Sequence, residues 1–180
     1  MSTQIALLRG INVGGRNLLA MSDLRELFEA IGLTGARSLL QSGNLVFHGD
    51  GRTGADLERL LEVETAKRLE VTVDYIIRNA DEWQTIISRN PFPKEAEDDP
   101  SHLVVMFFKK APTAKDVDLL QLAIKGPEVV HADGRQLYIV YPAGIGTSKL
   151  TNTLIEKKLG LRGTARNWNT VLKLAVLSQE

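Results

Sequence analysis

The order of hydrophobic patterns between residues 5 and 77 leaves this chain few possible folds. Short apolar or β-branched runs indicate strands at residues 5–9, 36–41, 44–48 and 71–77, and apolar residues at helical spacing indicate helices at residues 22–31 and 54–69. The order strand, helix, strand, strand, helix, strand is the ferredoxin-like arrangement. We therefore predict an α+β fold for this part of the chain.

A second copy of this order follows, without its last strand. Strands are expected at residues 102–108, 128–131 and 135–141, and helices are expected at residues 113–124 and 147–159. Asp133 and Gly134 predict a tight hairpin turn, because both residues tolerate a positive φ. The final strand is expected to be missing or very short, and a helix at residues 165–177 follows. The two modules share an order of elements but no recognisable repeat of sequence.

Residues 79–100 separate the two modules. A short helix that contains Trp83 is predicted at residues 81–89, and prolines then break it. Residues 94–100 are predicted to form an acidic loop, which is the best candidate for a domain boundary. The predicted organisation is a ferredoxin-like module at residues 1–78, a linker with a short helix at residues 79–100, and a second ferredoxin-like module with a C-terminal helix at residues 101–180.

The composition excludes several kinds of site. The chain of 180 residues has no cysteine, which excludes disulfides, thiolate catalysis and thiolate metal ligands. His48, His102 and His131 have no metal-ligand spacing, so neither a metal nor another cofactor is expected. No apolar run is long enough to span a membrane, and the first residues do not resemble a signal peptide. We therefore expect a cytoplasmic protein without a membrane partner.

Charge is distributed unevenly along the chain, although the 22 basic and 22 acidic residues balance. Residues 50–100 hold seven basic and thirteen acidic side chains, whereas residues 143–180 hold six and two. A protein that binds nucleic acid without sequence preference is usually basic overall, so this balance weakens that class of function. The basic C-terminal segment still permits a local site for an anion.

Residues 9–17, with the sequence RGINVGGRN, are the strongest candidate for a binding site. They join a predicted strand to a predicted helix, and a connection that only has to turn does not need two arginines. Glycine lets backbone N–H groups approach a ligand, and arginine binds carboxylate or phosphate with two hydrogen bonds. The spacing fits neither the dinucleotide-binding fingerprint nor the Walker A loop. The alternative interpretation is a long connection with a solvated Arg16.

A second polar cluster, Gln41, Ser42, Gly43 and Asn44, coincides with the first predicted hairpin. Serine and asparagine form turns readily, so turn formation alone explains these residues. We expect the end of the first strand and this hairpin to lie at opposite ends of the sheet. We also expect Arg9 and Gln41 to lie closer together than the tips of their two loops.

A third cluster, at residues 164–170, opens the predicted final helix. Thr164 is the predicted N-cap, which places Arg166 in the first helical turn. The helix dipole disfavours a cation there, so a carboxylate or a bound anion is expected close to Arg166. The alternative is a contact with an acidic residue that docks the helix.

A weaker candidate is the segment of residues 144–149, GIGTSK, which precedes the predicted helix at residues 147–159. Glycines ahead of a helix with a serine or threonine at its cap can bind an anion. Ordinary helix capping explains the same residues.

Four motifs together resemble a bacterial family known only as a domain of unknown function, family 1697. They are residues 9–17, Met21, residues 41–44 and residues 166–170. The resemblance extends over essentially the whole chain and implies two ferredoxin-like modules. It brings no activity, substrate or cofactor, but it implies that the separated motifs form one surface. One departure is the run Ser38-Leu39-Leu40, where the family often has threonine, tyrosine and an apolar residue.

These patterns leave three interpretations. The first is a site for a small anionic ligand, bearing phosphate or carboxylate, for which no motif supplies a general base or nucleophile. The second is an interaction module for nucleic acid or protein on the same basic surface. The third is a buried polar network that holds the modules together. The candidate ligand-binding residues are Arg9, Asn12, Gly14, Gly15, Arg16, Asn17, Gln41, Ser42, Asn44, Arg166, Asn167 and Asn169.

For the first interpretation we also expect the C-terminal helix to pack back on the first module. That packing is expected to bring Arg166 and Asn167 within about 15 Å of the loop at residues 9–17, a distance that two long side chains and a small ligand can bridge.

Overall fold

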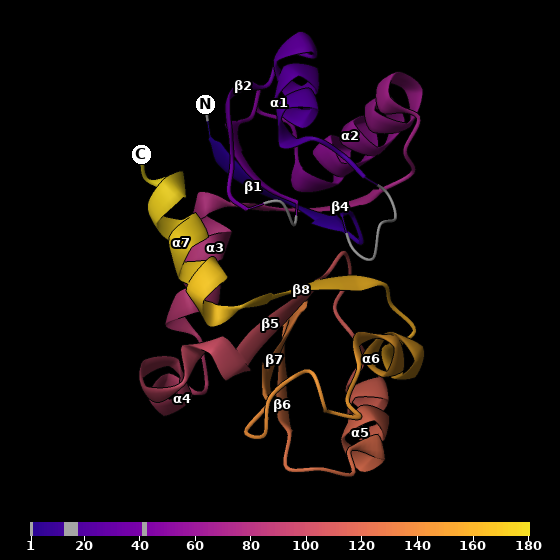
Figure 1. Ribbon diagram of the computed structural model, residues 1–180, viewed down its shortest axis with the longest axis vertical. Coiled ribbons are helices and arrows are strands. Elements are labelled where there is room, and N and C mark those ends of the chain that lie inside the picture. Colours follow the sequence, from indigo (N-terminus) through magenta and orange to yellow (C-terminus); the bar gives the residue numbers. More distant parts are fainter. Residues whose placement is uncertain (1, 13–17, 41–42) are drawn as a thin grey trace. The chain divides into compact units, whose positions relative to one another are not determined.

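The computed structural model describes residues 2–12, 18–40 and 43–180 and consists of two compact units (Figure 1). The first unit is Met1–Ser88 together with Lys173–Glu180, and the second unit is Arg89–Leu172. The chain therefore leaves the first unit once and returns to it near its end. Among the described residues, no helix has the length and apolar character needed to cross a membrane.

The first unit contains one antiparallel sheet of four strands in the order β2-β3-β1-β4. Its elements are β1 (Thr3–Arg9), α1 (Met21–Ala30), β2 (Thr34–Ser38), β3 (Asn44–His48), α2 (Gly54–Leu69), β4 (Asp74–Asn79) and α3 (Ala80–Ser88). Figure 1 shows α1 and α2 together on one side of this sheet. The predicted order of elements is confirmed.

The core of the first unit follows from the alternation of side chains along its strands. Ala6 and Leu8 of β1 and Phe47 of β3 point to the side of α1 and α2, where they belong to one buried cluster with Phe28. The rings of Phe28 and Phe47 meet edge to face with their centroids 5.0 Å apart. The apolar side chains that recur at helical spacing in α1 thus cover one face of the sheet.

The second unit repeats the same topology. Its elements are α4 (Pro93–Asp98), a 3-10 turn η1 (Pro100–His102), β5 (Leu103–Phe108), α5 (Ala114–Ala123), β6 (Val129–Asp133), β7 (Gln136–Val140), α6 (Asn152–Leu159), β8 (Gly163–Asn167) and the first part of α7 (Trp168–Ser178). The strand order β6-β7-β5-β8 matches that of the first unit strand by strand. The α+β fold with two ferredoxin-like modules and a C-terminal helix is therefore confirmed.

Strand β8 corrects the expectation that the second module lacks its last strand. Residues 163–167 pair with β5, with Arg166 opposite Val105, so Thr164 is in a strand and is not a helix cap. Gly163 permits this pairing, because a Cβ there would lie 2.7 Å from the Phe108 ring. Local propensity at residues 163–167 is overridden by a tertiary contact that the sequence does not reveal.

Two helical boundaries also differ from the prediction. The acidic stretch expected as a loop contains α4, which begins with Pro93 in the first turn, a position where proline costs no hydrogen bond. Helix α6 begins at Asn152 and not at Thr147, because the side chain of Thr151 accepts a hydrogen bond from the Leu154 N–H and caps the helix there.

Two strands of the first unit are shifted from their predicted positions. Strand β2 ends at Ser38, three residues before the predicted end, and β4 begins at Asp74, three residues after the predicted start. Strand β2 also has an irregular register between Thr34 and Arg37. The alternation of apolar and polar residues does not locate such irregularities. The strand boundaries therefore differ from the prediction, although the order of elements is as predicted.

The second half of the C-terminal helix, from Lys173 onward, belongs to the first unit, and its last turn packs on β2. Arg37 donates a hydrogen bond of 2.8 Å to the carbonyl oxygen of Leu177 and forms an ion pair of 2.9 Å with Glu180. An arginine at the carbonyl end of a helix also interacts favourably with the helix dipole. The expectation that this helix packs back on the first module is confirmed for its last turn.

Candidate functional site

Two connections of the first unit leave the same end of its sheet. Residues 10–20 join β1 to α1, and residues 39–43 join β2 to β3. Because β1 and β3 are antiparallel, the end of β1 lies beside the start of β3, and the Leu8 N–H donates to the Gly43 carbonyl at 2.9 Å. The expectation that these segments lie at opposite ends of the sheet was wrong, since it ignored the direction of β3.

The first of these connections is closed at its neck by Asn12. The Asn12 side chain donates to the Leu19 carbonyl at 3.0 Å, and its oxygen accepts from the Leu19 N–H at 2.8 Å. Asn12 has a φ of 55°, a left-handed conformation that asparagine adopts more readily than most residues. Both backbone groups of Leu19 are thus satisfied by one side chain, which ties Asn12 to the residues that lead into α1.

Gly43 packs the hairpin directly against this connection. Its φ is +84°, and a Cβ there would lie 2.9 Å from both the Leu8 Cβ and the Ile11 Cδ1. Next to it, Asn44 is completely buried and donates to the Leu39 carbonyl at 2.9 Å. The two polar motifs are therefore neighbours, and part of their composition is explained by this close packing.

Arg9, which the sequence predicted to bind a ligand, lies at this end of the sheet and within the part of the chain that the structure describes. It is half-buried at the end of β1, and the strand register places it opposite Asp74 of β4. Opposite residues of antiparallel strands have their Cβ atoms about 4.5–5.5 Å apart, and opposite charges at such positions attract each other.

Six of the predicted ligand residues lie outside the residues that the structure describes. They are Gly14, Gly15, Arg16, Asn17, Gln41 and Ser42.

The remaining three candidates, Arg166, Asn167 and Asn169, belong to the second unit. Arg166 is 9 % exposed and donates to the Thr164 hydroxyl at 2.6 Å and to the Ala165 carbonyl at 2.9 Å. Burial lowers the pKa of its guanidinium to about 10, so it stays charged at neutral pH. Because Arg166 is on β8, the argument from the helix dipole does not apply to it.

Asn167 and Asn169 have different surroundings. The Asn167 side chain accepts a hydrogen bond of 3.0 Å from the Thr170 N–H, so this residue caps α7 in the role predicted for Thr164. Asn169 is exposed on the first turn of the helix.

The sequence analysis missed the counterpart of Arg166 and Asn167 in the first unit. Arg78 is the penultimate residue of β4, is 1 % exposed and donates to the Ile77 carbonyl at 3.0 Å. Asn79 then caps α3, its side chain accepting from the Glu82 N–H at 2.8 Å. In each unit the fourth strand therefore ends in Arg-Asn, and a helix begins at the next residue.

A sequence signal for this repeat exists but is weak. The dipeptide Arg-Asn also occurs at residues 16–17 and 89–90, so it identifies the repeat only when the strand-to-helix boundary is known. In the first unit a strand ending at residue 77 and a helix at residues 81–89 were predicted, each within two residues of the observed boundary, and in the second unit the last strand was expected to be missing or very short. Among the residues that the structure describes, no cluster of histidine and carboxylate side chains is arranged to hold a metal ion.

Comparisons with known proteins give a family and a fold. A family model described as a protein of unknown function, DUF1697, matches residues 1–138. The structure of the conserved bacterial protein SP0830 from Streptococcus pneumoniae has a TM-score of 0.78 to this chain at 20 % sequence identity, with 98 % of each chain covered. At this identity the likeness establishes the fold alone. A comparison with curated proteins gives no match.

Proposed function

This chain belongs to the DUF1697 family, whose description assigns no activity, and from that premise we propose a function based on the first unit. The first unit binds a small anionic ligand that bears a phosphate or a carboxylate. The site is the end of the sheet where the connection at residues 10–20 and the hairpin at residues 39–43 meet.

The observation that carries this proposal is an internal comparison of equivalent connections. The second unit joins β5 to α5 with residues 109–113 and β6 to β7 with residues 134–135. The corresponding two connections of the first unit are longer, although they join equivalent strands and helices. Extra length in a connection on a shared scaffold is typical of binding loops.

The roles of Asn12 and Asn44 follow from their contacts, and the roles of the other polar residues follow from the chemistry of their side chains and backbone. Arg9 and Arg16 supply positive charge, and Gly14, Gly15 and Asn17 supply backbone and amide donors. Asn12 and Asn44 are engaged with the backbone groups of Leu19 and Leu39, so they act as scaffold. Arginine suits this task because its planar fork matches the two oxygens of a carboxylate or phosphate.

The test is a thermal unfolding screen of the full chain with inorganic phosphate, nucleotides, sugar phosphates, small carboxylates and short oligonucleotides. A ligand at a hundred times its Kd adds about 2.7 kcal/mol of stability. For a chain of this size Tm then rises by roughly 2–4 °C per kcal/mol. Arg9→Gln and Arg16→Ala are expected to abolish the shift while remaining folded.

Arg52→Ala is the matched control, because Arg52 is an exposed arginine in the connection from β3 to α2, at the other end of the same sheet. It should keep the full response to the ligand. If no compound raises Tm and Arg16→Ala strongly destabilises the protein, the motif is a structural polar network and the proposal fails. A response to oligonucleotides alone, falling steeply with salt, would favour nucleic acid instead.

A further inference from the structure

The second unit has a cavity of about 530 Å³ at the end of its sheet where β5 begins. At this end α5 leads into β6 and β7 leads into α6. These two connections, residues 124–128 and 141–151, are longer than their counterparts in the first unit, residues 31–33 and 49–53. The second unit therefore has its own extended loops, at the end of the fold where the first unit has short ones. Sites for small molecules commonly have volumes of about 300–1,000 Å³.

The cavity has an apolar wall. Leu122 and Ile124 from the end of α5, Leu150 from the β7–α6 connection and Leu154 from α6 all line it. Leu150 is buried, whereas Leu122 is 82 % exposed. Leucine side chains thus extend from the interior to the rim of the cavity. An apolar group that covers the exposed Leu122 would be bound more tightly, because both apolar surfaces are then removed from water.

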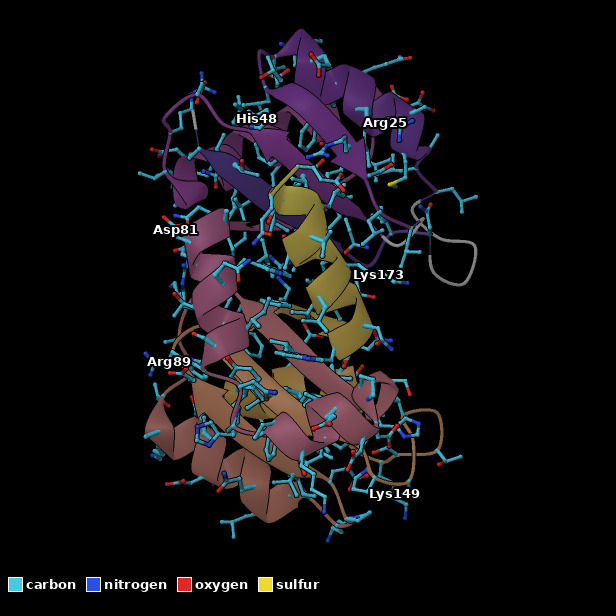
Figure 2. The ribbon with its side chains drawn as sticks, turned by 90° about the vertical axis from the view of Figure 1, so that its left-hand side faces the viewer. Arg25, His48, Asp81, Arg89, Lys149 and Lys173 are labelled. Atoms are coloured by element: carbon cyan, nitrogen blue, oxygen red, sulfur yellow. The ribbon has the colours of Figure 1, made fainter. Side chains whose placement is uncertain are left out.

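Three lysines surround this wall, each from a different part of the chain. Lys125 follows α5, Lys149 precedes α6, and Lys158 is on α6. Lys158 lies four residues after Leu154 and therefore on the same face of the helix. Lys149 lies at the outer surface of the second unit (Figure 2).

Glu128 is the acidic residue in the lining, and its carboxylate accepts a hydrogen bond from the Ser148 hydroxyl. The lining therefore has an excess of positive charge, with three lysines and one glutamate. Such a balance favours a ligand with a negative group.

The wall is held in place by Tyr141. Its hydroxyl donates a hydrogen bond of 3.0 Å to the Leu150 carbonyl, which closes the neck of the β7–α6 connection as Asn12 closes the neck of the β1–α1 connection. Burial, with a smaller contribution from Glu128, raises the pKa of Tyr141 to about 12, so the donor stays protonated at neutral pH. The Leu150 N–H also donates to the Ser148 hydroxyl at 3.0 Å.

We propose that this cavity binds a small amphipathic anion, with an aliphatic or aromatic body against the leucine wall and a carboxylate or sulfonate among the three lysines. The apolar wall favours the body of the ligand, and the lysines favour its charged group. The site is independent of the one proposed for the first unit, because no residue is shared between them.

The experiment uses the fluorescent probe anilinonaphthalene sulfonate with the full chain and displaces it with decanoate or with decanol. These competitors share a chain and differ in the charge of the head group. Decanoate is expected to displace the probe at lower concentration than decanol. The affinity for decanoate should fall by about twofold to fivefold, the range of exposed ion pairs, in each of the variants Lys125→Gln, Lys149→Gln and Lys158→Gln.

Lys115→Gln is the matched control, since Lys115 is exposed on α5 and does not line the cavity. It should leave the displacement of the probe by decanoate unchanged. Leu154→Asn should weaken decanoate and decanol alike. The proposal is overturned if the probe does not bind saturably, if decanol competes as well as decanoate, or if all three lysine variants bind like the wild type.

Discussion

In the first unit the long connections leave the end of the sheet where β1 finishes, whereas in the second unit they leave the end where β5 begins. The sheets have the same strand order, and in both units the fourth strand ends in Arg-Asn before a helix. The longest connection of each unit, residues 10–20 or residues 141–151, is bridged by one side chain, Asn12 or Tyr141. The shared scaffold therefore explains what is common to the two units, and the two proposed sites lie where the units differ.

This comparison makes each unit a control for the other. A residue with an equivalent in both units can be replaced in each, and the two losses of stability can be compared without a change of fold. Equal losses indicate a scaffold role, and unequal losses reveal what one unit has added.

The largest effect is expected at the two buried arginines. Arg78→Ala leaves a cavity where a side chain is only 1 % exposed and removes the hydrogen bond to the Ile77 carbonyl. These two losses together are expected to lower the free energy of unfolding by about 2–5 kcal/mol. Arg166→Ala should lose less, because Arg166 is 9 % exposed and water reaches part of the space. Urea denaturation of both variants measures the difference. Equal losses would contradict the asymmetry inferred from burial.

The next effect is expected at the equivalent turn glycines. Gly43→Ala introduces a Cβ within 2.9 Å of Leu8 at a φ of +84°, and overpacking of this kind destabilises by about 1–3 kcal/mol. Gly134→Ala has a φ of +60° but only the Gln136 amide nearby, at 3.9 Å, so backbone strain of roughly 1 kcal/mol is expected. Thermal unfolding should show a lower Tm for Gly43→Ala than for Gly134→Ala. The reverse order would contradict the close packing of Gly43 against Leu8 and Ile11.

A smaller and equal effect is expected at the helix caps. Asn79→Ala and Asn167→Ala each remove a side chain that accepts from a backbone N–H of the following helix, which costs about 1 kcal/mol. Chemical denaturation should give the two variants the same loss. A loss at Asn167 well below that at Asn79 would show that Asn167 has a task other than capping.

The smallest effect is expected where α2 and α6 end. Glu70 and Gly160 follow these helices with φ values of 57° and 65°, a conformation that favours glycine. Glu70→Gly should therefore stabilise by about 0.5–1 kcal/mol, and Gly160→Ala should destabilise by a similar amount. Calorimetry of both variants checks the opposite signs, and a destabilising Glu70→Gly would indicate a contact of Glu70 that outweighs its backbone strain.

The order of elements was predictable from the sequence because it depends on periodicity. Helix α2 spans residues 54–69 as predicted, and its N-cap Thr53 accepts from the Asp56 N–H. Strand β8 was missed because its pairing depends on a contact between Gly163 and Phe108, which are far apart in the sequence. Local patterns contain no information on such contacts.

The candidate sites were predictable only in part. The sequence singled out Arg9 and Asn12, but it could not indicate that Asn12 is bonded to Leu19. The cavity in the second unit has no motif beyond the segment at residues 144–149, because its lysines and leucines come from two helices and two connections. Such sites become visible when the elements are placed in space.

The contact of Arg37 with Leu177 and Glu180 has a consequence for synthesis on the ribosome. Arg37 is translated early, while its partners are translated after the whole of residues 89–172. The second unit can therefore complete its own contacts while the first still lacks its final helical turn. The order in which the units are finished is the reverse of the order in which they are begun.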